Sequence, residues 1–117
     1  MKPSNVLIKE LSKKLDGLVN LPGILEWIDG PTFKFVLKQL RNKYWDNVPE
    51  VHQRAILAVI EGFVADDYSE IDKSVETSIN HLVDLPWVEG ENEALVVSHM
   101  VQLLMRLILS NNPKNAV

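Results

Sequence analysis

The amino-acid sequence predicts an all-α fold, a single-domain bundle of about five helices. Apolar residues recur every three to four positions along most of the chain, and no segment shows the alternation typical of a half-buried strand. A chain of 117 residues can bury one hydrophobic core but not two. We expect helices near residues 5–19, 31–45, 48–65, 70–84 and 91–110, in a domain spanning 1–112 with a disordered tail at 113–117.

The first helix is expected to start at Ser4, whose hydroxyl suits an N-cap, and to end before Pro22 and Gly23. Four leucines at helical spacing form its predicted core stripe: Leu7, Leu11, Leu15 and Leu18.

The second helix is expected to begin at Pro31, because the missing N–H of proline has no partner in the first turn of a helix. Its predicted apolar face consists of Phe33, Val36, Leu37, Leu40 and Tyr44. A separate face carries the cations Lys34, Lys38 and Arg41.

Capping patterns predict the starts of the third and fourth helices. Asn47 and Glu50 have the spacing of a capping box, and Ser69 with Asp72 suggests a second one. The third helix is apolar around more than half its circumference, through Val51, Ala55, Ile56, Ala58, Val59, Ile60, Phe63 and Val64. The predicted core stripe of the fourth is Ile71, Val75, Ile79 and Leu82.

The last helix contains the most apolar stretch, with twelve apolar residues among the sixteen of 94–109. This apolar stretch is shorter than the ~18–20 residues that a membrane span needs. We therefore expect a buried helix and no membrane association.

A five-residue pattern occurs twice, as Leu-Val-Asn-Leu-Pro at 18–22 and as Leu-Val-Asp-Leu-Pro at 82–86. One interpretation is a pair of pseudo-repeated αα-hairpins, related by a pseudo-twofold and joined by the central helix. The other is coincidence, since leucine-rich helix ends followed by proline are common.

Charge is unevenly distributed, with a balance of +4 over residues 1–43 and −8 over 44–117. The two parts either fold together and moderate each other's field, or leave a basic face for an acidic partner or for head-to-tail self-association. Lys34, Lys38 and Arg41 are the candidate contacts for an acidic partner. Nucleic acid is not an expected partner, because so few cations on an acidic chain give a weak phosphate interaction.

The sequence offers little catalytic chemistry. It contains no cysteine, its five glycines stand singly, and no histidine follows a glutamate by three residues. No nucleophile or acid–base pair stands out. We predict a non-enzymatic protein with no catalytic residues, no metal site and no cofactor.

Polar residues within the apolar helices are weaker candidates. His81, near the end of the fourth helix and one turn before Asp84, suits the helix dipole. Ser98, His99, Gln102 and Arg106 form a polar strip that is either the solvated side of the last helix or the lining of a pocket or symmetric interface. Three tryptophans beside predicted loops either plug the bundle ends or serve as binding hot spots: Trp27, Trp45 and Trp87.

The apolar perimeter of the third and last helices exceeds what a small bundle can enclose, which predicts a protein-interaction module that forms a homodimer or binds an unidentified protein. The predicted interface is Val97, Met100, Val101, Leu104, Met105 and Ile108, or the opposite face of the same helix. The alternative is a bundle that binds a small apolar ligand in a cavity lined by Phe63, Met100, Leu104 and Met105. The N-terminus has no signal-peptide pattern, so we expect a cytoplasmic location.

Overall fold

The computed structural model describes residues 2–16, 30–82 and 92–110, and every regular element within those ranges is helical. The prediction of an all-α bundle of about five helices is therefore confirmed. In chain order the elements are α1 (Asn5–Asp16), α2 (Gly30–Gln39), the π-helical turn η2 (Leu40–Tyr44), the 3₁₀ turn η3 (Trp45–Asn47), α3 (Glu50–Ala65), α4 (Lys73–Asn80) and α5 (Asn92–Ser110).

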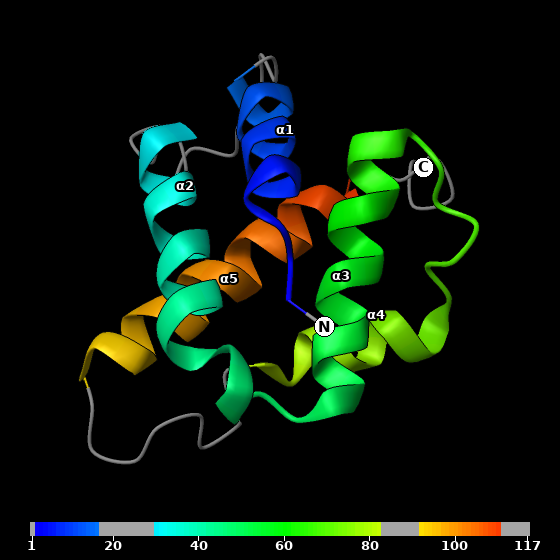
Figure 1. Cartoon of the computed structure of the whole chain (residues 1–117). Helices are drawn as coiled ribbons and strands as arrows, with labels where there is room; N and C mark the ends of the chain where they lie inside the picture. The colour runs from blue at the N-terminus through cyan, green and yellow to red at the C-terminus, as the bar shows by residue number, and fades with distance from the viewer. Residues whose placement is uncertain (1, 17–29, 83–91, 111–117) are drawn as a thin grey trace.

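Figure 1 shows α1 between α2 and α3, with α5 crossing behind all three. Helix α1 packs against α2 and α3, α4 packs against α3 and α5, and α5 also contacts α2 and α3. One side of α5 is thereby covered by three other helices. The core lies between α5 and the layer formed by α1, α2 and α3.

Helix α1 begins as predicted, since the Leu7 N–H donates to the Ser4 hydroxyl at 3.0 Å. Its core side differs by one residue from the expected stripe, because Ile8 is fully buried and Leu7 only partly. Leu18, and the expected end of this helix, lie outside the described residues.

The second helix follows its predicted pattern closely. All five residues of its expected apolar face are buried, and the chain continues helically from α2 into η2 and η3. Trp45 in η3 is 2% exposed, so it closes one end of the bundle and is no exposed hot spot. Trp27 and Trp87 lie outside the described residues.

The start of α3 contradicts the predicted capping box. The residue preceding the helix is Pro49, which makes no side-chain cap, while Asn47 belongs to η3. The 3₁₀ turn extends the preceding helix because the Val48 N–H donates to the Trp45 carbonyl at 3.1 Å. Val51, part of the predicted apolar perimeter of this helix, is 57% exposed in the first turn of α3.

Helix α3 ends in a tight reversal that depends on glycine. Asp66 adopts a left-handed conformation with φ 54°, and the Asp67 N–H donates to the Gly62 carbonyl at 2.9 Å. A Cβ at Gly62 would lie 2.9 Å from the Asp67 carbonyl oxygen, so only glycine allows this close approach without a shift.

Helix α4 starts later than expected. Asp72 is its N-cap, accepting a hydrogen bond from the Val75 N–H at 3.0 Å, and the helix begins at Lys73. Ser69 has another role, because its N–H donates to the Asp67 carboxylate at 3.1 Å. The prediction of a second capping box at Ser69 was wrong.

Helix α5 has 19 residues, so it is long and apolar enough to cross a membrane, contrary to the length argument above. However, 56% of its most apolar segment is buried against the rest of the chain, as in the core helix of a globular protein. The repeated five-residue patterns, apart from Leu82, lie outside the described residues. Helix α3 contacts both α1 and α4, as a connector between two halves would.

Candidate functional site

The predicted interface on α5 lies largely inside the chain. Five of its six residues are at most 4% exposed and belong to the hydrophobic core: Val97, Val101, Leu104, Met105 and Ile108. They cannot meet a second molecule while the chain is folded, because α2, α3 and α4 already cover this side of the helix. Only Met100 is partly accessible.

The predicted polar strip is divided between the two sides of α5. Ser98 and Gln102 are buried, with their hydrogen bonds made inside the chain. The Gln102 amide donates to the Asn80 carbonyl at 3.3 Å, and the Arg106 Nε donates to the Asn80 side-chain oxygen, also at 3.3 Å. Asn80 ends α4, where carbonyls lack partners within their own helix. Gln102 and Arg106 therefore join α4 to α5, and the expectation of a solvated strip was wrong for the buried Ser98 and Gln102.

The opposite face of α5 carries an accessible apolar stripe. Leu95 and Val96 are each 55% exposed, Met100 and Leu103 are partly buried, and His99 is exposed among them. Their spacing places them along one side of the helix. We call this set the outer stripe: Leu95, Val96, His99, Met100 and Leu103.

Polar contacts mark both edges of the outer stripe. On one edge the Lys43 ammonium lies 3.3 Å from the Glu93 carboxylate, linking η2 to α5. On the other edge Arg106 binds Asn80 of α4. The outer stripe thus runs between α2 and α4, with an acid near its start and a guanidinium near its end.

Phe35 extends this apolar surface onto α2. Its side chain is 62% exposed, and Phe35 and Gln39 lie on one edge of the helix because they are four residues apart. The chain continues along that edge to Lys43, which pairs with Glu93 of α5. This spacing places Phe35 on the line of α2 that leads to Lys43 and, through its ion pair, to Glu93 of α5.

Within the described ranges, five large apolar side chains are exposed, and three of them belong to this surface: Phe35, Leu95 and Val96. The other two, Val6 and Val51, stand on α1 and α3. Single exposed apolar residues are ordinary, whereas a cluster marks an interaction surface. Sequence reasoning considered the opposite face of α5, but it did not include Phe35, because only the packing of α2 on α5 brings Phe35 there.

The basic candidates are not equivalent. Lys38 is exposed and Lys34 partly so, as an external contact requires. Arg41 is engaged within the chain, since its Nε donates to the Pro3 carbonyl at 2.8 Å and its terminal nitrogen to the Asn42 side chain at 2.8 Å. Arg41 thus ties the N-terminal segment to η2.

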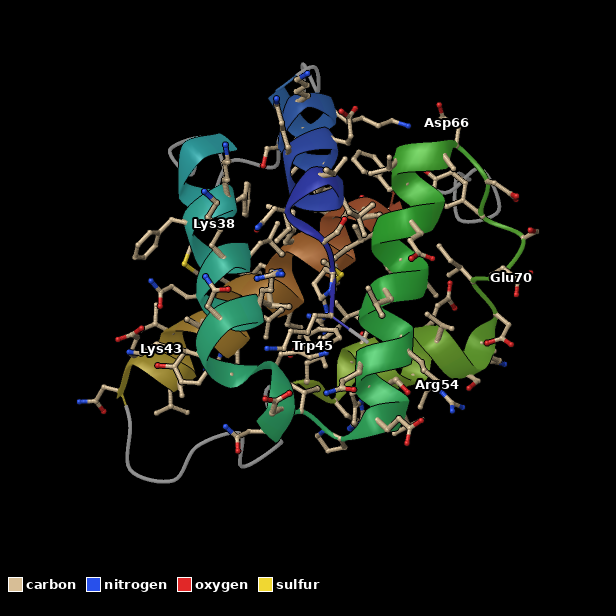
Figure 2. All side chains as sticks on the ribbon, viewed as in Figure 1. Lys38, Lys43, Trp45, Arg54, Asp66 and Glu70 are labelled. Atoms are coloured by element: carbon tan, nitrogen blue, oxygen red, sulfur yellow. The ribbon has the colours of Figure 1, made fainter. Side chains whose placement is uncertain are left out.

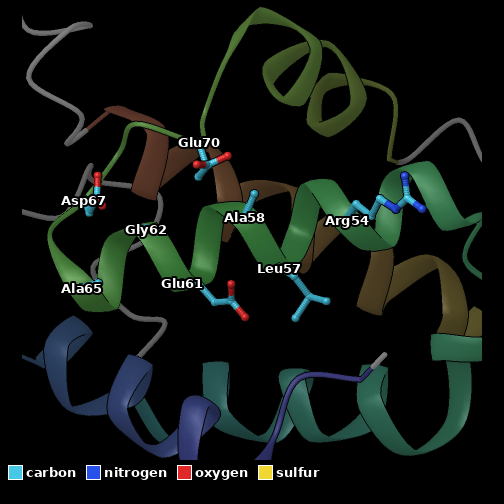
Figure 3. Close-up of a pocket in the computed structure, with 8 residues that line it drawn as sticks. All are labelled: Arg54, Leu57, Ala58, Glu61, Gly62, Ala65, Asp67 and Glu70. Carbon is cyan, nitrogen blue, oxygen red and sulfur yellow. The ribbon is translucent and has the colours of Figure 1, made fainter.

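A groove of about 460 Å³ lies on the outer side of α3 (Figure 3). It is lined by Arg54, Leu57, Ala58, Glu61, Gly62, Ala65, Asp67 and Glu70. Arg54 and Glu61 are both exposed. The lining does not include the residues of the predicted apolar-ligand cavity, of which Phe63, Leu104 and Met105 are buried in the core.

In the loop beside this groove, local contacts shift the pKa values of Asp67 and Tyr68. Hydrogen bonds from the Ser69 hydroxyl and N–H lower the pKa of Asp67 below its ordinary value. Burial raises the pKa of Tyr68, and the nearby charge of Asp66 adds to the increase. Both shifts follow from local contacts, and the groove lining offers no paired nucleophile and base.

No group of three or more potential metal ligands occurs within residues 2–16, 30–82 and 92–110. The chain matches no protein-family model, no curated protein and no solved structure. Arguments about function therefore depend on the chain's own surfaces.

Proposed function

We propose that this chain is a non-enzymatic protein-interaction module that forms a twofold dimer through the outer stripe of α5 and the adjacent Phe35. The observation that carries the proposal is the clustering of exposed apolar side chains on this one surface. Burying half-exposed leucine, valine and phenylalanine side chains against a second copy removes apolar area from water, which is the main favourable contribution to association.

The outer stripe is self-complementary when two α5 helices pair antiparallel. Glu93 and Arg106 are equally distant from the point midway between His99 and Met100. A twofold axis through that point brings Glu93 of each copy opposite Arg106 of the other, and Val96 opposite Leu103. Charges then attract at both ends, while apolar side chains meet in between.

The apolar-ligand alternative has less support. Three of its four expected lining residues fill the core, and the described groove on α3 is open and has charged side chains among its lining residues. A second copy, by contrast, accounts for apolar surface that is already exposed.

The Val96→Glu substitution tests the dimer. We expect wild-type protein to sediment at twice its chain mass of 13.3 kDa at micromolar concentration. Val96→Glu should weaken dimerisation by at least about tenfold, because it would bury an unpaired carboxylate. Sedimentation velocity over a concentration series measures both.

The matched control is Val51→Glu, since Val51 is the same residue type with nearly the same exposure, 57% against 55%. It should leave the dimer unchanged. A monomeric wild-type chain at tens of micromolar, or equal effects of the two substitutions, would contradict the proposal.

A further inference from the structure

The solvent side of α1 and α2 carries four lysines in two pairs. Lys9 and Lys13 are four residues apart on α1, and Lys34 and Lys38 are four apart on α2. Each pair therefore lies along one face of its helix. Lys9, Lys13 and Lys38 are exposed, and Lys34 is partly exposed. We call these four the seam lysines.

Contacts elsewhere on each helix show where the two pairs lie. On α1, Lys14 binds Asp66 and the Phe63 carbonyl of α3, so Lys14 marks the α3 side of this helix. Lys9 and Lys13 project away from that side. On α2, Arg41 continues the line of Lys34 and Lys38 and binds the Pro3 carbonyl, immediately before α1. Both pairs therefore border the seam where α1 and α2 pack together.

None of the seam lysines forms an ion pair with a described side chain. The ion pairs in that part of the chain involve Lys14, Lys43 and Arg54. Glu10, the exposed acid of α1, lies three residues before Lys13 and four before Lys14, and it forms an ion pair with neither. Like charges four residues apart destabilise a helix. An external anion would offset this repulsion.

We propose that this seam binds an acidic helical segment of a partner protein. The cations of each pair are separated by one helical turn, about 6 Å along the axis. Aspartate or glutamate four residues apart on a helix has the same separation. A rod-shaped segment lying along the seam reaches lysines from both α1 and α2.

The charge distribution favours a short acidic segment over a long or flat polyanion. Figure 2 shows Lys38 on one side of the molecule, and Asp66 and Glu70 on the opposite side beyond α3. Residues 44–117 carry a net charge of −8, which repels an extended nucleic acid or an anionic bilayer. A short helix confined to the seam keeps clear of that side. The seam lysines belong to α1 and α2, whereas the outer stripe belongs to α5, so the two proposals are tested separately.

Fluorescence anisotropy tests the proposal with a labelled, alanine-rich helical peptide of about 15 residues that carries glutamates four residues apart, titrated with the full chain at about 0.05 M salt, where screening is moderate. We expect saturable binding that Lys34→Gln/Lys38→Gln weakens about threefold to tenfold. Arg54→Gln/Lys73→Gln removes the same charge from exposed positions on α3 and α4, and should change the affinity less than about twofold.

Two competing ligands complete the experiment: an oligothymidylate of about 15 nucleotides and vesicles containing phosphatidylserine. Absence of saturable binding of the acidic helical peptide would overturn the proposal, as would equal losses in the two double variants. Tighter binding of either competitor would also overturn it, by assigning the seam to nucleic acid or to a membrane surface.

Discussion

Replacing Trp45 with alanine is expected to lower the free energy of unfolding by about 3–5 kcal/mol, the usual cost of truncating a buried large aromatic residue. The indole is 2% exposed in the short turn that joins α2 to α3. The Gln53 side-chain amide and the Val48 N–H both donate to the Trp45 carbonyl, which alanine retains. The loss therefore comes from removal of the indole side chain. Urea unfolding followed by circular dichroism gives the value.

Phe35→Ala is the control for Trp45→Ala, because it truncates an aromatic side chain that is 62% exposed. In dilute, monomeric protein it should cost less than about 0.5 kcal/mol. Similar losses in the two variants would show that Trp45 does not close the bundle as described.

Leucine truncations on the two sides of α5 are expected to have opposite consequences. Leu104 is fully buried, and Leu104→Ala should destabilise the chain by about 2–5 kcal/mol. Leu95 is 55% exposed, and Leu95→Ala should cost less than about 0.5 kcal/mol in the monomer. Dimerisation should respond in reverse, weakening in Leu95→Ala and persisting in folded Leu104→Ala.

The two readouts are urea unfolding at low protein concentration and sedimentation at higher concentration. If Leu104→Ala remains as stable as wild type but no longer dimerises, then the inner face of α5 is the interface and the assignment of the two faces is reversed.

Periodicity predicted helices well where one face is clearly apolar. All five expected core residues of α2 are buried, because its cations leave a single apolar side. The pattern was less specific at helix ends. In α1 the apolar pattern favoured Leu7, although Ile8 is the fully buried residue. In α3 the apolar pattern included Val51, which is exposed in the first turn of the helix.

Helix starts were harder to predict because adjacent turns compete for the same residues. Asn47 has the chemistry of an N-cap, but the 3₁₀ turn after Trp45 includes it and leaves Pro49 before α3. Asp72 does cap α4, whereas Ser69 is engaged with Asp67. Composition alone does not show which of two neighbouring polar residues ends the preceding turn.

The surface of α5 could be predicted only in part, since apolar residues surround most of the helix. Ser98 and Gln102 suggested the solvated side, yet both are buried, and Gln102 satisfies a carbonyl at the end of α4. The position of α4 therefore decides which side of α5 stays accessible. Likewise, the seam between α1 and α2 depends on the packing of the two helices, which the sequence does not show.

Cysteine cross-linking tests the outer-face dimer most directly, because the chain contains no cysteine of its own. His99→Cys places a thiol beside the proposed twofold axis, where paired helices 8–10 Å apart bring it close to its counterpart. Ser110→Cys is the control, since antiparallel pairing separates the two copies of this position by roughly 30 Å along the helix axis. We predict that mild oxidation converts most His99→Cys protein to covalent dimer and leaves Ser110→Cys monomeric. A monomeric His99→Cys variant, or equal cross-linking of the two, would contradict the account.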